Sequence, residues 1–516
     1  MNKNIFNSIQ MSKPKNNLFD LSHDVKLSLN MGELVPIMVM ETVPGDRFNI
    51  SVETLLRFAP LVSPVMHRMN CTIHYFFVPN RILWDGWEDF ITNTKTGGIL
   101  PEFPFNKIHP DGSNYNKLLD YLGCPRPDQT TALASEDISA FPINAYQKIY
   151  DEYYRDQNLQ PSTYEKLING DNPLATGVEL LHKRAWGHDY LTSALPFAQK
   201  GDPVQLPIVF NDVDVYQNVN NVTPGTTVVN WNETETPGGG VKSGLAEVRN
   251  PDAGATSDLF ANTSSLAGSS TINDLRRAYA LQRWLEKAAR AGSRYFESIL
   301  AIFGIKSPDS RLDRPEYITG TQSPVVISEV LNTTGDTGAA DPLPQGNMSG
   351  HAISIMNSKN GSYFCQEHGY IMGIMSVIPM TAYQQGMPKH FTKTTDPTQF
   401  FTPDFANIGE QEILNKEVMA FSSIGTDPFG YTPRYAEYKY ESNRVAGEFR
   451  TNLDFWHLGR IFDNTLQPAL NSEFITCVPD SRIFAVTDIE TQKLYAHVYN
   501  KIKAIRPMPK YGTPTF

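Results

Sequence analysis

Short apolar segments bounded by Pro, Gly, Asp or Asn recur at both ends of this 516-residue chain, and their distribution constrains the fold most strongly. Such segments, rich in β-branched and aromatic side chains, are typical of strands. The early group lies within residues 33–80 and comprises ELVPIMVME, VPGDRF, LVSPVM and CTIHYFFVPN. The late group comprises residues 324–330, 351–357, 370–378, 474–478 and 494–505. We therefore predict an all-β framework whose strands pair across hundreds of residues.

A jelly roll with long insertions between its strands fits two groups of strands separated by a long middle. We expect the framework at residues 33–83 and 320–505, with helical or loop insertions at 84–205 and 271–319. In residues 71–78 both alternating sets of side chains include apolar groups, which is typical of a strand covered on each face. One cover is expected to be the core, and the other a neighbouring subunit or an inserted loop.

Residues 141–160 predict a helix within the first insertion. Tyr146, Ile149, Tyr150 and Tyr153 stand at helical spacing there. An aromatic stripe of this kind favours packing over a ligand site.

Residues 271–303 predict two consecutive helices. The first begins at an N-cap, Thr271, and repeats apolar residues at helical spacing until Gly292. The second, at residues 294–303, ends at Gly304, because glycine suits the position after a helix. We expect this pair on the surface of the framework or at a subunit contact.

Residues 206–270 have a different composition, with seven acids and seven glycines against Lys242 and Arg249. A segment this polar buries little, so it forms either a functional surface loop or a disordered stretch. We predict a surface protrusion, with these candidate receptor-facing residues: Asp212, Asp214, Trp231, Glu233, Glu235 and Asp252.

The net charge of −11 argues against a protein whose whole exterior binds nucleic acid. The two ends are the exception, because residues 1–19 and 501–516 contain seven cations and no acid. These basic ends either face a polyanion or are simply solvated termini. The cations are Lys3, Lys13, Lys15, Lys501, Lys503, Arg506 and Lys510.

An extended segment at residues 494–505 would place aromatic and cationic side chains on one face: Tyr495, His497, Tyr499, Lys501 and Lys503. Single-stranded nucleic acid is bound by such surfaces, because bases stack on rings and phosphates pair with cations. The alternative is a strand face that meets solvent or another subunit.

Catalytic and metal-binding spacings are absent from the sequence. It contains no G-x-S-x-G, no P-loop, no G-x-G-x-x-G and no H-E-x-x-H, and its four cysteines form no CxxC pair. The N-terminus lacks the apolar core of a signal peptide, and no run is long enough to cross a bilayer. We therefore expect a non-enzymatic protein made in a reducing cytoplasm, without cofactor, metal or membrane insertion.

Six ordered blocks of sequence resemble the major capsid protein of Microviridae, in particular the gokushovirus-like phages. They lie at residues 19–48, 57–84, 143–159, 184–201, 272–320 and 506–514, and INDLRRAYALQRWLEKAARAGSRYFESILAIFGIKSPDSRLDRPEYITG is the most specific. The resemblance implies one capsid domain over residues 1–516, built on an eight-stranded jelly roll. It also implies sixty copies in a T=1 icosahedral shell around single-stranded DNA.

The same resemblance implies a virion location and several partners. These are internal scaffolding and minor capsid or pilot proteins, and a bacterial surface receptor met by a protrusion at residues 206–270. An alternative is a receptor- or carbohydrate-binding jelly-roll protein of a phage that does not form the shell. A secreted carbohydrate-active enzyme is disfavoured, because no export signal or paired-carboxylate motif is found.

Overall fold

The computed structural model describes residues 15–94, 99–127, 134–174, 181–202, 204, 215–217, 259–261, 272–292, 294–331, 346, 348–463, 467–488 and 490–511. The chain divides into two compact units. One comprises residues 1–198 and 289–516, and the other residues 199–288. Among the described residues, no helix is long and apolar enough to cross a membrane.

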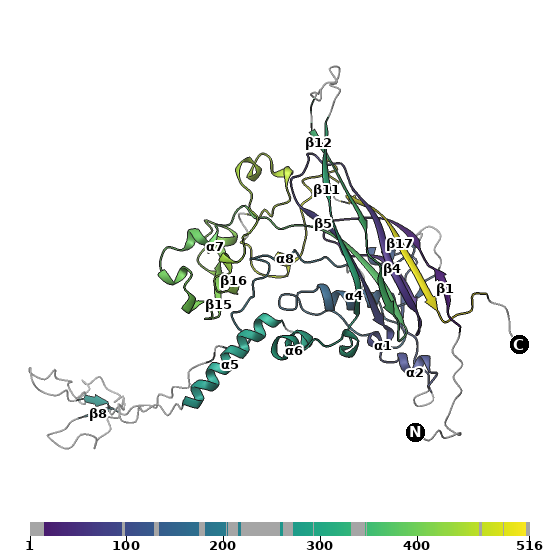
Figure 1. Ribbon diagram of the computed structural model, residues 1–516, viewed down its shortest axis with the longest axis horizontal. Coiled ribbons are helices and arrows are strands. Elements are labelled where there is room, and N and C mark those ends of the chain that lie inside the picture. The colour runs from purple at the N-terminus through teal and green to yellow at the C-terminus, as the bar shows by residue number, and fades with distance from the viewer. Residues whose placement is uncertain are drawn as a thin grey trace, which may run out of the picture. The chain divides into compact units, whose positions relative to one another are not determined.

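Two antiparallel sheets dominate the larger unit, so the expectation of a mainly β protein is confirmed (Figure 1). The seven-stranded sheet contains β1 (Asn17–Asp20), β2 (His23–Leu29), β4 (Arg47–Phe58), β11 (Val326–Leu331), β12 (Met348–Asn357), β13 (Gly361–Phe364) and β17 (Leu494–Arg506). The four-stranded sheet contains β3 (Val35–Thr42), β5 (Met69–Pro79), β10 (Glu316–Pro324) and β14 (Gly369–Pro379).

The strand order joins distant parts of the chain, as the sequence predicts. β17 lies between β4 on one side and β1 and β2 on the other, so the two ends of the chain form neighbouring strands. In the smaller sheet the order is β10-β5-β14-β3. Inward side chains of both sheets form one apolar core, which includes Ile50, Ile73 and Val498, each fully buried.

The outer face of the four-stranded sheet carries a second apolar cluster, because an inserted segment covers it. Phe76 and Met372 on this face pack in one cluster with Phe141 and Tyr146 of α4 (Phe141–Ile149). The cluster also takes in α1 (Asn80–Leu83) and α3 (Lys117–Tyr121). The two-faced cover predicted for residues 71–78 is thus confirmed, and the second cover is an inserted loop.

The predicted aromatic stripe is packing. Tyr146 and Ile149 are fully buried, and the hydroxyl of Tyr146 donates a 2.8 Å hydrogen bond to the Leu34 carbonyl oxygen. After Ile149 the helix continues as a π-helical turn, Tyr150–Tyr154. Tyr153 in that turn donates a 2.5 Å bond to the Pro315 carbonyl oxygen.

The predicted helices of residues 271–303 are present. α5 spans Ile272–Ala291 and is followed by Gly292 at φ +100°, while Thr271 lies outside the described residues. α6 (Tyr295–Phe303) ends at Gly304, which adopts the left-handed conformation at φ +71°.

Further short elements complete the fold. They are α2 (Trp87–Ile91), α7 (Asn415–Val418) and α8 (Ser472–Ile475), and the strand pairs β6 (Phe105–Ile108) with β7 (Glu136–Ser139), β8 (Val215–Gln217) with β9 (Leu259–Ala261), and β15 (Glu410–Leu414) with β16 (Pro428–Pro433).

Three strand predictions are wrong. Residues 43–46 form a turn, and only Arg47 and Phe48 of the segment 43–48 belong to a strand, β4. Residues 474–478 do not form a strand, because the chain makes the short helix α8, whose first turn is capped by Asn471 Oδ1 accepting a 2.8 Å bond from the Phe474 amide. Residues 61–66 form no continuous strand, and only Leu61 makes isolated bridges. Conversely, β1, β2, β10 and most of β4 were not among the predicted strands.

Candidate nucleic-acid interface

β17 alternates strictly between core and surface, which confirms the predicted division of its two faces. Ala496, Val498 and Ile502 point into the core. The opposite side chains are exposed or half-buried, and they are the ones selected from the sequence: Tyr495, His497, Tyr499, Lys501 and Lys503. The strand therefore presents interleaved rings and cations outward.

Neighbouring strands add carboxylates to this face. His497 Nε2 lies 2.9 Å from Asp24 Oδ1, across the pairing of β17 with β2. Lys501 Nζ donates to Glu53 Oε1 of β4, and this bond raises the pKa of Lys501. Lys503 stands opposite Asp20 of β1. Much of the positive charge that the sequence shows is thus offset within the sheet.

A moderate positive excess remains on this face. Across β1, β2, β4 and β17, five cations stand against three carboxylates if Arg506 is set aside. The cations are Lys26, Arg47, Arg57, Lys501 and Lys503, and the carboxylates are Asp20, Asp24 and Glu53. We define this set, with Tyr495, His497 and Tyr499, as the β17 face.

Arg506 has a structural role. Its Nε lies 3.4 Å from Oδ2 of the fully buried Asp46, and its Nη2 donates a 2.7 Å bond to the Glu41 carbonyl oxygen. The guanidinium also lies over the Phe48 ring. Its partners hold it away from any ligand, so Arg506 is a weak candidate for DNA contact.

The two basic ends leave the sheet at the same corner. Asn17 pairs with Arg506 in the β1–β17 ladder, and Asn17 Nδ2 donates a 2.7 Å bond to the Met508 carbonyl oxygen. Lys15 and Lys510 are both exposed beyond this point. Lys3 and Lys13 lie outside the described residues.

The candidate receptor-facing residues also lie outside the described residues: Asp212, Asp214, Trp231, Glu233, Glu235 and Asp252. What is described of residues 206–270 is the antiparallel pair of β8 and β9. This pair belongs to the separate unit of residues 199–288.

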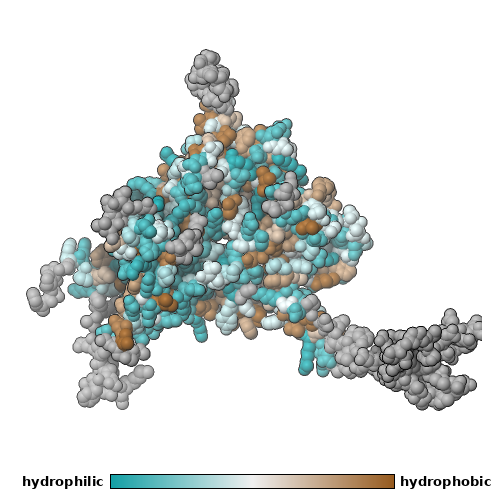
Figure 2. Space-filling model, turned by 180° about the vertical axis from the view of Figure 1, so that it is seen from behind, coloured by the Kyte–Doolittle hydropathy of each residue, from teal (hydrophilic) through white to brown (hydrophobic). Residues whose placement is uncertain are grey.

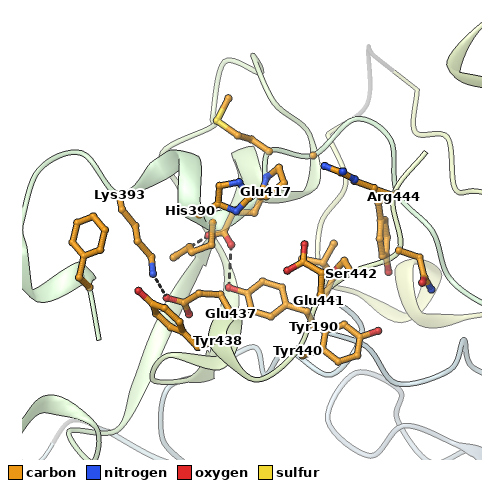
Figure 3. Close-up of a pocket in the computed structure, with 18 residues that line it drawn as sticks. Tyr190, His390, Lys393, Glu417, Glu437, Tyr438, Tyr440, Glu441, Ser442 and Arg444 are labelled. Atoms are coloured by element: carbon orange, nitrogen blue, oxygen red, sulfur yellow. Dashed lines mark hydrogen bonds and ion pairs between the residues drawn. The ribbon is translucent and has the colours of Figure 1, made fainter. Parts of the chain in front are cut away.

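A cavity of about 300 Å³ lies in the segment that contains α7, β15 and β16, and sequence reasoning missed it (Figure 3). Glu417 receives a 2.7 Å bond from Lys389 and a 3.0 Å bond from the Tyr190 hydroxyl. Lys393 pairs with Glu437 at 2.7 Å. The lining residues come from distant stretches of the chain, so no local sequence motif predicts this cavity.

Both lysines that line this cavity are paired with carboxylates. Burial and the adjacent Glu417 raise the pKa of Tyr190. Burial also acts to raise the pKa of Glu437, but hydrogen bonds from Lys393 and Gln411 outweigh it and hold that pKa below its usual value. Within the described part of the chain, no group of three or more His, Cys, Asp or Glu is placed to hold a metal ion.

Comparison with known proteins covers nearly the whole chain. The model of the capsid protein (F protein) family matches residues 7–516. The chain is 33% identical over 595 residues to "Capsid protein VP1" of Chlamydia phage 1, covering 99% of this chain and 97% of that protein. It is 34% identical over 549 residues to "Capsid protein VP1" of Bdellovibrio phage phiMH2K, with coverages of 99% and 98%. The protein of the same name from Spiroplasma virus 4 is 28% identical over 532 residues, with coverages of 96% and 94%.

A mainly antiparallel-sheet chain that is similar along its length to phage capsid proteins is a structural component of a virion and not an enzyme. It belongs to the capsid protein (F protein) family. A capsid protein acts as many copies in a shell, so its main partner is itself.

Proposed function

We propose that sixty copies of this chain form a T=1 icosahedral shell around a single-stranded DNA genome. The observation that carries the proposal is full-length similarity to phage capsid proteins, joined to a sandwich whose first and last strands pair. Subunits would be made in the cytoplasm of the bacterial host and would assemble with internal scaffolding and minor capsid or pilot proteins.

The strand order supports an eight-stranded jelly roll. Numbered along the chain, β2, β3, β4, β5, β10, β12, β14 and β17 become strands one to eight. One sheet then has the order 1-8-3-6 and the other 2-7-4-5. The adjacent pairs 1–8, 2–7, 3–6 and 4–5 are the rungs of a single long antiparallel ribbon folded over on itself, which is the topology of viral jelly rolls.

The β17 face and the two basic ends are our candidates for contact with packaged DNA. Support comes from the rings of Tyr495 and Tyr499 among cations, on a strand next to both ends of the chain. Bases would stack on the rings while Lys503, Lys15 and Lys510 neutralise phosphates. Glu53 binds Lys501, and Asp24 binds His497, so these two side chains attract phosphate only weakly. We therefore expect a weak contact that does not depend on the base sequence of the DNA.

Residues 206–270 are our candidate for host attachment. Their polar composition and their place in a separate unit support a segment that varies without disturbing the shell. The cognate partner would be a bacterial surface receptor.

Negative-stain microscopy of the protein, purified from cells that also supply the phage's other structural proteins, tests the shell. The proposal requires closed particles of uniform size. Isolated subunits under these conditions would contradict it and favour the alternative, a receptor- or carbohydrate-binding phage protein outside the shell.

A further inference from the structure

α5 carries a stripe of exposed cations around one tyrosine. Arg276, Tyr279, Arg283 and Lys287 follow the spacing i, i+3, i+7 and i+11, which places them on one side of a helix. All four are exposed, and the Tyr279 side chain is 72% exposed. No ion pair involves these three cations among the described residues. We call these four residues the α5 stripe.

Large apolar side chains elsewhere on α5 are also open to solvent. Of its 20 residues only Ala289 is buried within the described structure, while Leu275 and Trp284 are 54% and 52% exposed. Most helical stability in proteins comes from packing of an apolar face, so a helix that leaves large apolar side chains exposed beside a cationic stripe indicates a partner. The partner must offer apolar contact together with negative charge.

A surface of the larger unit has these two properties. Three isoleucines, Ile91, Ile99 and Ile168, are 48%, 75% and 63% exposed. Exposed carboxylates stand beside them in the same three chain segments: Glu88, Glu102 and Asp171. We call these six residues the 88–171 surface.

The framework beneath this surface is fixed. Phe90 and Phe103 pack at 5.3 Å between ring centroids, and each also packs on Trp84. The Gly170 amide donates a 3.3 Å bond to the Glu102 carbonyl oxygen, and Trp84 Nε1 donates a 2.9 Å bond to Asn169 Oδ1. The three segments therefore form one rigid support.

Among the described residues, two lysines close in sequence to the 88–171 surface already have other partners. Lys166 already pairs with Asp85 at 2.6 Å, and Lys107 pairs with Asp137 at 4.0 Å. Glu88, Glu102 and Asp171 are recorded in no ion pair within the described residues. Three carboxylates and three isoleucines thus match the three cations and the aromatic ring of the α5 stripe.

We propose that the α5 stripe of one subunit docks on the 88–171 surface of a neighbouring copy, as a heterologous contact of the shell. This rests on the proposed function, because it needs copies arranged by closed symmetry. Complementary charge would select the register of the contact, while Tyr279 and the isoleucines would supply apolar burial. The alternative ligand for such a stripe is DNA phosphate. Charge reversal distinguishes DNA binding from docking on a neighbouring subunit.

Charge reversal on each side tests the contact. One variant carries Arg276→Glu, Arg283→Glu and Lys287→Glu, and the other Glu88→Lys, Glu102→Lys and Asp171→Lys. Each is produced with the phage's other structural proteins under conditions in which the wild-type chain forms shells. Shell yield is expected to fall at least about tenfold in each, because like charges then face one another. The matched control, Arg277→Glu on another side of α5, should assemble normally.

The combined six-residue variant is expected to restore shells made of itself. When it is co-produced with a differently tagged wild-type chain, the two should segregate into separate shells, because each mixed contact repels. Glutamine replacements of the same three α5 cations should lower the yield less than glutamate does.

Four results would overturn the contact. The first two are a normal shell yield in both triple variants, and a combined variant that makes no shells although its unfolding temperature equals that of the wild type. The others are shells that mix the two chains, and a normal yield of closed shells that lack only DNA. The last would assign the stripe to nucleic acid. Absence of shells from the wild-type chain would instead reject the proposed function.

Discussion

The hydroxyl of Tyr75 donates a 2.8 Å hydrogen bond to Asn500 Oδ1 across the interior of the sandwich. Tyr75 belongs to β5 and Asn500 to β17, so this bond joins the two sheets. Asn500 is fully buried and also donates a 3.2 Å bond to the Ile37 carbonyl oxygen of β3. A buried polar group satisfied in this way sets how the sheets align.

Breaking the bond from either side should destabilise the subunit. Tyr75→Phe or Asn500→Leu leaves a buried polar group without a partner, at a cost of about 1–3 kcal/mol in the free energy of unfolding. Urea denaturation of the soluble subunit measures this cost. The double variant should lose less than the two single losses combined, since it removes both polar partners. Strict additivity would show that the bond does not couple the sheets.

Acid should weaken the cover over the four-stranded sheet. Burial lowers the pKa of His74 and of His182 to about 4, from 6.5. His74 Nδ1 lies 2.8 Å from the Tyr154 hydroxyl, and the His182 ring stacks on Tyr150. Between pH 6.5 and 4 the unfolded chain binds more protons than the folded chain, so stability falls as pH falls.

The loss should approach about 1.4 kcal/mol per pH unit for each histidine in the middle of that window. Thermal unfolding across this range measures it. His74→Gln with His182→Gln should flatten the profile. The exposed pair His109→Gln with His351→Gln serves as control and should leave it steep. Identical profiles for the wild type and the His74/His182 variant would contradict the assignment.

DNA binding should depend on the exposed end lysines. Changing Lys15, Lys503 and Lys510 to Gln should reduce the salt dependence of binding to a single-stranded oligonucleotide by about two units of log–log slope. The control changes three other exposed lysines, Lys306, Lys359 and Lys439, to Gln. Equal slopes for both variants would remove these lysines from the interface. Deleting residues 501–516 is unsuitable, because it removes half of the central strand β17.

Host attachment should depend on residues 206–270 without affecting the shell. A variant shortened within this range should assemble with normal yield, because the range lies outside the unit that contains the two large sheets and ends before α5. Binding of purified particles to host cells should drop at least about tenfold, the loss expected when a few dominant contacts disappear. Normal adsorption would exclude this segment as the attachment site.

Sequence patterns predicted those elements whose side chains alternate clearly. The division of β17 into an apolar and an aromatic–cationic face was visible, and so were the two apolar faces of β5. In β4, inward residues such as Ile50 and Val52 also alternate, but the outward Arg47, Glu53 and Arg57 make the segment too polar to stand out.

The charges of the candidate site could not be predicted from local sequence. Asp24 is 473 residues from His497, and Glu53 is 448 residues from Lys501, yet each meets its partner across the sheet. Arg506 was likewise chosen for its charge, although its role depends on the distant and buried Asp46. Register in a sheet of long-range pairs is set by the whole fold, so sequence spacing could not reveal this neutralisation.

The mass of the intact particle tests the central claim most directly. Sixty copies of the 57.8 kDa chain in a closed symmetric shell give a protein mass of about 3.5 MDa. Charge-detection mass spectrometry of DNA-free shells, corrected for other structural proteins by gel densitometry, measures this quantity. A single species with that contribution from the chain is the predicted result. A mass that corresponds to another copy number, or a broad distribution of open assemblies, would contradict the account.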